Sequence, residues 1–257
     1  MPVTEDAYPI IKVQGMTAGY DGDIILDNLS FEVYRGEVFV ILGGSGCGKS
    51  TLLKQMIGLY KPTSGRVLID GEDIVTADHD QRINIIRKIG VMYQSGALFG
   101  SMDLLENVRL PLEVFTDLPS EAMELIALMK LKLVGLNGFS HHMPSELSGG
   151  MRKRAAIARA MALDPQILFL DELSAGLDPI TSVELDHLIL NLARNLKITF
   201  VIVTHELPSI FTIADRAIML DKGLKGIVAE GHPADLRDHS DNPGVRQFFN
   251  REVTPTG

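Results

Sequence analysis

The segment from residue 43 to residue 50 constrains the fold of this chain more than any other part of the sequence. It reads Gly-Gly-Ser-Gly-Cys-Gly-Lys-Ser and fits the pattern G-x-x-x-x-G-K-[ST]. The run before it, Val38–Leu42, is short and apolar like a buried strand, and Lys49–Ile57 after it has a helical pattern. A chance glycine-rich turn would lack this context. The strand, the glycine loop and the helix together predict a phosphate-binding loop.

The residue types in this loop suit a nucleotide phosphate. Glycines let the backbone bend tightly, so that N–H groups converge on phosphate oxygens at the start of a helix. Lys49 adds a positive charge for the β- and γ-phosphates, and the Ser50 hydroxyl suits Mg²⁺. We therefore expect ATP to contact Gly43, Gly44, Ser45, Gly46, Cys47, Gly48, Lys49, Ser50 and Thr51.

A second apolar run, Ile167–Leu170, ends in two carboxylates. Asp171 is predicted to hold Mg²⁺ directly or through water. Glu172, one residue further, is predicted to act as general base on a water in line with the γ-phosphate. The alternative is a strand that merely ends in solvated acids, and the phosphate-binding loop upstream makes that alternative weaker.

The whole chain alternates between strand-like and helical patterns, which predicts an α/β fold with a mainly parallel sheet. Two regions depart from the alternation: residues 10–40 read as an antiparallel sheet with a turn at Asp21-Gly22, and residues 95–165 are nearly all helical. Further strands are predicted at Val67–Asp70 and Thr199–Val203, with a strand pair within Ile218–Gly231. Further helices are predicted at Ser120–Val134, with Ser120 as N-cap, and at Gly149–Leu163.

Composition limits the function classes. The formal net charge of -9 argues against a nucleic-acid partner, because phosphate contacts need clustered Lys and Arg. A single cysteine, Cys47, excludes an intrachain disulfide and is typical of a reducing compartment. Residues 1–20 lack the pattern of a signal peptide, and no apolar run is long enough to span a bilayer. A membrane function would therefore need a membrane partner.

A phosphate-binding loop followed by Asp-Glu is also found in kinases, helicases and GTPases. Leu147-Ser148-Gly149-Gly150-Met151 separates this chain from them, because it resembles the signature motif of ABC ATPases, which usually ends in Gln. A Ser hydroxyl and Gly amides at a helix start make a second anion site. The resemblance implies a head-to-tail homodimer in which each signature motif closes over the ATP of the partner.

Four further positions match the same family in the expected order. The resemblance implies that Tyr20 stacks on adenine, with a core tyrosine as the alternative, and that Gln94 senses Mg²⁺ and couples to a permease. It also implies that Asp178 lies in the D-loop at the dimer interface and that His205 contacts the γ-phosphate. The residues expected to act in catalysis are Lys49, Glu172 and His205, and those expected to hold Mg²⁺ are Ser50, Gln94 and Asp171.

The resemblance divides the chain into the parts of one nucleotide-binding domain. Residues of about 8–93 and 166–231 would form the RecA-like core with its antiparallel part, and about 94–165 the helical signature subdomain. The tail of about 232–257 is predicted to gain order only in a complex. Leu173 replaces the Pro usual after the catalytic Glu and is not expected to touch nucleotide.

Finer features are similar to the ATPase subunits of Mla-type phospholipid transporters. These are Met151 in place of Gln, the segment Gln94-Ser95-Gly96-Ala97-Leu98-Phe99, and Val245-Arg246-Gln247-Phe248 near the end. The likeness implies a permease, an MCE-domain lipid-binding protein, a STAS-domain protein, and a place on the cytoplasmic face of the inner membrane. Three alternatives stay open: the ATPase of an importer for a small polar solute, a soluble ABC protein of DNA repair or ribosomes, and a regulatory module that binds ATP without hydrolysis.

Three basic residues, Arg152-Lys153-Arg154, follow the signature motif. Such a run is typical of the exposed face of a helix whose Ala side packs inward. The alternative is a patch that attracts phosphate or lipid headgroups. The sequence therefore predicts three solvated side chains here.

Overall fold

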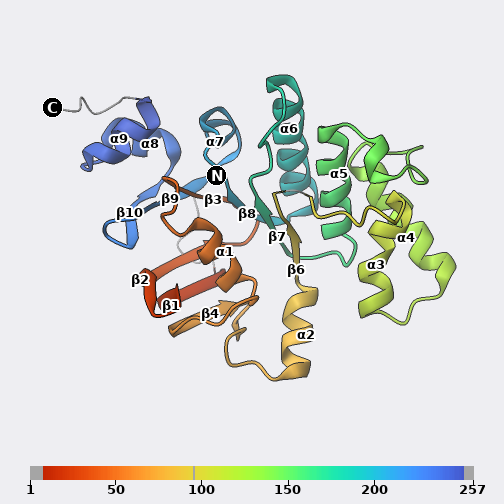
Figure 1. Cartoon of the computed structure of the whole chain (residues 1–257), viewed down its shortest axis with the longest axis horizontal. Helices are drawn as coiled ribbons and strands as arrows, with labels where there is room; N and C mark the ends of the chain where they lie inside the picture. Colours follow the sequence, from red (N-terminus) through yellow and green to blue (C-terminus); the bar gives the residue numbers. More distant parts are fainter. Residues whose placement is uncertain (1–7, 95, 252–257) are drawn as a thin grey trace.

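The computed structural model describes residues 8–94 and 96–251, whose strands form two sheets (Figure 1). The larger sheet has the order β10-β9-β3-β8-β7-β6, and its pairs are parallel except for β9–β10. Its strands are β3 (Val38–Gly43), β6 (Ile89–Met92), β7 (Ile167–Asp171), β8 (Thr199–Val203), β9 (Arg216–Asp221) and β10 (Gly226–Gly231). The predicted α/β class is confirmed.

The smaller sheet is antiparallel, with the order β2-β1-β4-β5. Its strands are β1 (Pro9–Tyr20), β2 (Asp23–Tyr34), β4 (Ser64–Ile69) and β5 (Glu72–Asp73). The predicted turn at Asp21-Gly22 joins β1 to β2, and both residues have the positive φ that a two-residue hairpin turn requires. The strand predicted at Val67–Asp70 starts earlier and ends one residue sooner, because Asp70 has a φ of 50° and turns the chain.

The helices lie around the larger sheet, and α3, α4 and α5 gather at one end of the molecule (Figure 1). The helices are α1 (Lys49–Met56), α2 (His79–Arg87), α3 (Leu104–Phe115), α4 (Ser120–Leu133), the 3₁₀ turn η1 (Pro144–Glu146), α5 (Gly149–Ala160), α6 (Pro179–Leu196), α7 (Leu207–Ile213), α8 (Pro233–His239) and α9 (Pro243–Asn250). The prediction of Ser120 as N-cap is wrong, since Pro119 has the extended N-cap conformation and Ser120 is already helical. Helix α5 ends at Ala160, before the predicted Leu163.

The parallel strands bring their carboxyl ends to one edge of the larger sheet. Val203 pairs with Ile41 of β3 and with Asp171 of β7, and Met92 of β6 pairs with Leu170 of β7. The segments that follow β3, β6, β7 and β8 therefore start side by side. This edge is where open α/β sheets bind ligands.

The tail is ordered in the single chain up to α9. The side chains of Leu236, Val245 and Phe249 are buried, and the Phe249 ring lies 5.7 Å from the ring of Phe211 on α7. The prediction that this tail gains order only in a complex is wrong for residues 233–250. Apolar side chains at helical spacing give α9 a buried face. The prediction relied on the overall polar composition of the segment and did not consider this spacing. Residues 252–257 lie outside the described part of the chain.

Replacing Phe249 by alanine is expected to lower the free energy of unfolding by about 3 kcal/mol, because it opens a cavity under α9. The neighbouring Phe248 is only partly buried, so Phe248→Ala should cost less and serves as the matched control. Urea unfolding of the free chain measures both. Equal effects, or none, would show that α9 does not pack on the core in solution.

Candidate functional site

The glycine loop runs from the end of β3 to the start of α1. All six residues of β3 are buried, so the loop leaves from a fixed strand. Gly48 is the N-cap of α1 with a φ of 104°, and a Cβ there would lie 2.6 Å from the Leu26 side chain. A larger residue would therefore strain the backbone and clash. The bend that turns backbone N–H groups toward a phosphate depends on glycine at this position.

Lys49 lies over the loop in the way a phosphate site needs. Its Nζ donates to the carbonyl oxygens of Gly43 at 2.8 Å and Gly44 at 3.0 Å. Gly44, Ser45 and Gly46 form an exposed rim. An ammonium group held beside an open run of backbone amides fits a nucleotide triphosphate.

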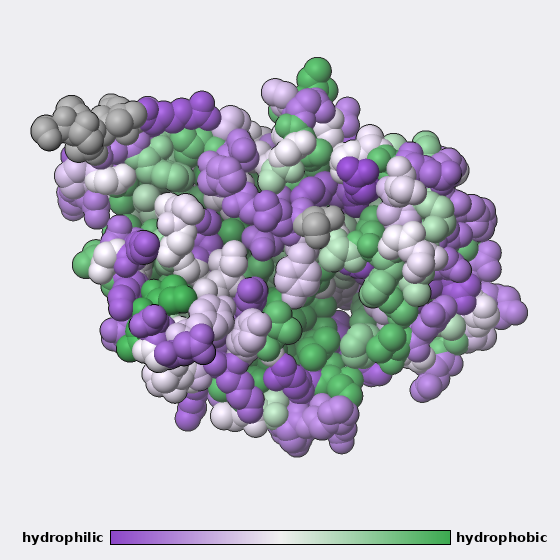
Figure 2. Space-filling view, in the orientation of Figure 1, coloured by the Kyte–Doolittle hydropathy of each residue, from purple (hydrophilic) through white to green (hydrophobic). Residues whose placement is uncertain are grey.

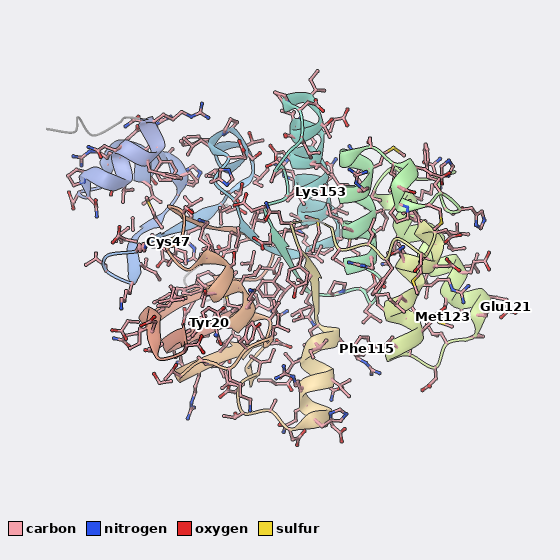
Figure 3. All side chains as sticks on the ribbon, in the orientation of Figure 1. Tyr20, Cys47, Phe115, Glu121, Met123 and Lys153 are labelled. Carbon is pink, nitrogen blue, oxygen red and sulfur yellow. The ribbon has the colours of Figure 1, made fainter. Side chains whose placement is uncertain are left out.

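The loop residues differ in the exposure of their side chains. The side chains of Cys47 and Thr51 are buried, whereas Ser50 is exposed at the first turn of α1. Figure 3 shows Cys47 where the loop meets α1. Cys47 and Thr51 can therefore meet a nucleotide through their backbone, while the Ser50 hydroxyl can reach a metal ion.

Two carboxylates follow each other at the end of β7. Burial and the neighbouring Glu172 carboxylate raise the pKa of Asp171, and the charges of Lys54, Lys153 and Lys49 oppose the rise. Asp171 and Gln94 line one open hollow of ≈ 490 Å³ together with Tyr93 and Ala175. A divalent cation in this hollow would favour the charged form of Asp171, so the donor set fits Mg²⁺.

Glu172 is held in an uncommon conformation with a free carboxylate oxygen. Its φ of 51° lies in the left-handed region, which a non-glycine residue rarely adopts. Its backbone N–H donates to Val203 O at 2.8 Å, and Oε1 lies 2.9 Å from His205 Nδ1. Oε2 is buried without a hydrogen-bond partner among the described residues. A buried, unpaired carboxylate oxygen is a ready acceptor for the proton of a water.

Tyr20 lies at the end of β1 with 38% of its surface exposed, so the alternative of a core tyrosine does not hold (Figure 3). Its ring stands edge-on to the Tyr60 ring at 5.8 Å, and Lys54 Nζ lies 5.7 Å from the Tyr60 ring centre. Aromatic rings with a cation of α1 beside them suit a purine ring. Stacking of adenine on Tyr20 stays a prediction.

Arg159 of α5 holds the segment after β6. Its guanidinium donates to Ala97 O at 2.7 Å and Gly96 O at 2.9 Å, and lies 5.9 Å from the centre of the Phe99 ring. The side chain of Gln94 is exposed, and Ser95 lies outside the described residues. The Gln94–Phe99 segment is therefore attached to the helix that begins at the signature motif.

The signature motif forms the start of α5. Ser148 is the N-cap, and its Oγ accepts from Met151 N at 3.2 Å, while Leu147 is buried. A Cβ at Gly150 would lie 2.4 Å from Thr181 Cγ2, so glycine lets α5 pack closely on α6. A Cβ at Gly149 would lie 3.0 Å from Leu177 Cδ2.

Asp178 caps the helix on which the signature motif packs. Its Oδ1 accepts from the backbone N–H groups of Ile180 at 3.1 Å and Thr181 at 3.0 Å, and its Oδ2 accepts from the Thr181 hydroxyl at 2.6 Å. The Thr181 hydroxyl and amide lower the pKa of Asp178. Leu173, which stands where Pro was expected, is buried in the apolar core and exposes no group to the loop.

The signature motif does not lie beside the glycine loop of its own chain. In Figure 1, β7 and β8 lie between α1 and α5, and Asp171 is the last residue of β7. These strands therefore separate α5, which begins at the signature motif, from the helix that follows the phosphate loop. That a second copy brings its signature motif to the nucleotide stays a prediction, implied by the resemblance to ABC ATPases.

Lys153 is a site residue that sequence reasoning missed. It was predicted to be solvated, but it is 7% exposed and its Nζ donates to Gln94 O and, at 3.2 Å, to Glu172 O. Burial lowers its pKa, and the carboxylates of Asp171 and Glu172 oppose the shift. The prediction failed because Gly150, Lys153 and Ile157 share the buried face of α5 at helical spacing, a signal that the sequence did contain.

A groove of ≈ 310 Å³ lies between the core and the gathered helices. It is lined mainly by apolar side chains of α2, β6, α3 and α5, among them Ile86, Val91 and Phe115, with Arg159 at one side. Figure 2 shows apolar surface gathered around a hollow in this region, and Figure 3 labels Phe115 at the end of α3. Within residues 8–94 and 96–251, no helix is long and apolar enough to cross a membrane.

Comparisons with known proteins agree with this geometry. A family model described as ABC transporter matches residues 26–175. The "Probable ribonucleotide transport ATP-binding protein mkl" of Mycobacterium leprae is 42% identical over 248 residues, which cover 96% of this chain and 71% of that protein. The "Intermembrane phospholipid transport system ATP-binding protein MlaF" of Escherichia coli (strain K12) is 43% identical over 225 residues, which cover 88% and 82%.

Solved structures give the same picture. The ATP-binding cassette MJ0796, described as a dimer in a post-hydrolysis state bound to ADP and Pi, is 34% identical with a TM-score of 0.78, covering 86% of this chain and 98% of that one. The cbiO1 protein from Clostridium perfringens, part of an ABC transporter complex, is 30% identical with a TM-score of 0.82, covering 90% and 91%.

Proposed function

The chain belongs to the ATP-binding proteins of ABC transporters, which couple ATP hydrolysis to transport, and from that premise we propose that it drives phospholipid transport between the inner and outer membranes. The observation that carries the proposal is the 43% identity to proteins named for intermembrane phospholipid transport. Met151 and Gly96, at the two places where the sequence resembles Mla-type ATPases most specifically, support it.

The hydrolysis step assigns one task to each site residue. Lys49 and the loop amides would hold the phosphates of ATP, and Ser50, Asp171 and Gln94 would hold Mg²⁺, which would neutralise charge on the phosphates. Glu172 takes a proton from the attacking water, and His205, whose Nδ1 lies 2.9 Å from Glu172 Oε1, contacts the γ-phosphate. The signature motif Leu147–Met151 acts on the nucleotide of the partner subunit.

The proposed assembly is a homodimer of this chain on a membrane permease, at the cytoplasmic face of the inner membrane. The groove lined by Val91 and Phe115 would receive the permease, because it is apolar and because Arg159 joins it to the Gln94–Phe99 segment. An MCE-domain lipid-binding protein and a STAS-domain protein would complete a phospholipid transporter.

A second candidate function is import of a small polar solute. The mycobacterial relatives, 42% identical, are named for ribonucleotide transport. Cargo is selected by the permease and its partners, so the two functions need not differ in the ATP site. The partners therefore discriminate between them.

Purification of the tagged chain from membranes in mild detergent, with identification of the bound proteins and lipids, tests the proposal. A permease with an MCE-domain protein and phospholipid is the expected result. A permease with a solute-binding protein and no lipid would favour the second candidate. Phe115→Asp in the groove should reduce recovery of the permease about tenfold, as loss of one buried apolar contact allows. Val114→Asp, on the exposed face of the same helix, is the control.

A further inference from the structure

We propose that Lys153 is a positioning residue for ATP hydrolysis, which fixes the backbone that carries Glu172 and Gln94 and ties both to the signature helix. The inference rests on the roles proposed above for Glu172 and Gln94. It assigns a task to a side chain that belongs to none of the motifs found in the sequence.

The first support is the pair of carbonyl groups that Lys153 holds. Its Nζ donates to Gln94 O and to Glu172 O, two segments that follow different strands, β6 and β7. Hydrogen bonds from a charged donor are stronger than neutral ones, and their strength rises away from water. One buried ammonium group thus fixes the separation between the Mg²⁺-sensing segment and the general base.

The second support is the way Glu172 itself is held. Its N–H donates to Val203 O at 2.8 Å, and its carbonyl accepts from Lys153, so the peptide groups on both sides of its Cα are fixed. With both peptides fixed, the direction of the Cα–Cβ bond is fixed as well. The left-handed φ of 51° costs free energy and persists only where surrounding contacts impose it. Lys153 supplies one of those contacts.

The third support is where Lys153 stands on its helix. It lies on α5 between the signature N-cap Ser148 and Arg159, which holds the segment after Gln94. A helix behaves as a rigid element over this length. Displacement of the signature end relative to the sheet therefore changes the Lys153 contacts to Gln94 and Glu172. Hydrolysis becomes conditional on the position of α5.

A comparison within the chain separates positioning from simple packing. Lys130 on α4 is as buried as Lys153, at 6% against 7% exposed, and its Nζ pairs with Asp164. Among residues 8–94 and 96–251, Lys130 has no hydrogen bond or ion pair with a segment of the candidate site. Loss of either lysine should lower stability, but only loss of Lys153 should slow the chemical step.

The test measures phosphate release and ATP affinity of the purified full-length chain with four substitutions. Lys153→Met removes the donors and keeps the length; kcat should fall about 10- to 100-fold with KM for ATP within about threefold, as expected for displaced catalytic groups. Lys153→Arg, which keeps a charged donor, should recover kcat to within about fivefold of wild type. Lys130→Met should keep wild-type kcat. Glu172→Gln gives the residual kcat of a site that lacks its general base.

Each outcome decides. A Lys153→Met kcat within twofold of wild type, or an equal loss of kcat in Lys130→Met, overturns the inference. If Lys153→Met does not fold, Lys153→Gln is judged by the same criterion. Wild-type turnover in Glu172→Gln would instead show that Glu172 is not the general base. The proposed role on which this inference rests would then fail, whatever the lysine variants do.

Discussion

Glutamine at position 172 is expected to lower the rate of ATP hydrolysis about 1,000-fold, because the amide cannot accept the proton that the attacking water must lose. Glutamine keeps the size of the side chain and can still contact His205. ATP binding should therefore stay within about threefold of wild type, since the phosphate-binding groups at Lys49 and the glycine loop are untouched.

Two measurements check this result. Phosphate release gives the rate, and gel filtration with and without ATP and Mg²⁺ shows whether the variant accumulates as a closed dimer. Glu121→Gln is the matched control, because Glu121 is an exposed acid on α4, far from the end of β7 (Figure 3). Turnover near the wild-type rate in Glu172→Gln would remove Glu172 from its role, and the buried oxygen Oε2 would need another explanation.

Arginine at position 148 is expected to lower hydrolysis at least about 100-fold while leaving ATP binding by the isolated chain unchanged, because electrostatic groups supplied in trans contribute at this scale. Ser148 is exposed at the start of α5, so the larger side chain fits the folded chain. It would instead obstruct the surface that closes on the nucleotide of the partner subunit.

The Glu172→Gln background makes this second prediction sharper. The chain with Glu172→Gln alone should dimerise in the presence of ATP. The chain with both Glu172→Gln and Ser148→Arg should stay monomeric although it binds ATP. Ser145→Arg, an exposed position three residues earlier on η1, is the control for added charge and size. Weaker ATP binding by the monomeric Ser148→Arg chain would show that the signature motif acts on its own nucleotide.

The strand ends of this protein could be predicted from sequence because local patterns determine them. The apolar runs before Gly43, Asp171 and His205 identify buried parallel strands, and parallel strands bring their carboxyl ends to one edge. The phosphate loop, Asp171 and Glu172 therefore required no knowledge of tertiary contacts, whereas the role of His205 came from the resemblance to ABC ATPases. The same reasoning predicted the turn at Asp21-Gly22, where the dipeptide alone selects the backbone conformation.

The features that sequence reasoning missed depend on contacts between distant segments. The helical spacing of Lys153 with Gly150 and Ile157 indicates that its face of α5 is buried, but the carbonyl groups that it contacts follow two distant strands and cannot be read from that spacing. Helix α9 is ordered because Phe249 meets Phe211, which lies in a different element. Ser120 was assigned as a cap from residue type alone, while the backbone placed Pro119 at the boundary. Pairings across the chain, rather than residue preferences, decide such positions.

The left-handed conformation of Glu172 sets the stability of this protein against its ATP hydrolysis. A residue with a side chain costs of order 1 kcal/mol more than glycine at such a φ, so the position favours glycine on stability alone. Selection of variants for heat resistance would tend to remove the carboxylate that hydrolysis requires. A thermostable form of this protein is therefore better sought at positions away from the end of β7, with turnover assayed at every round.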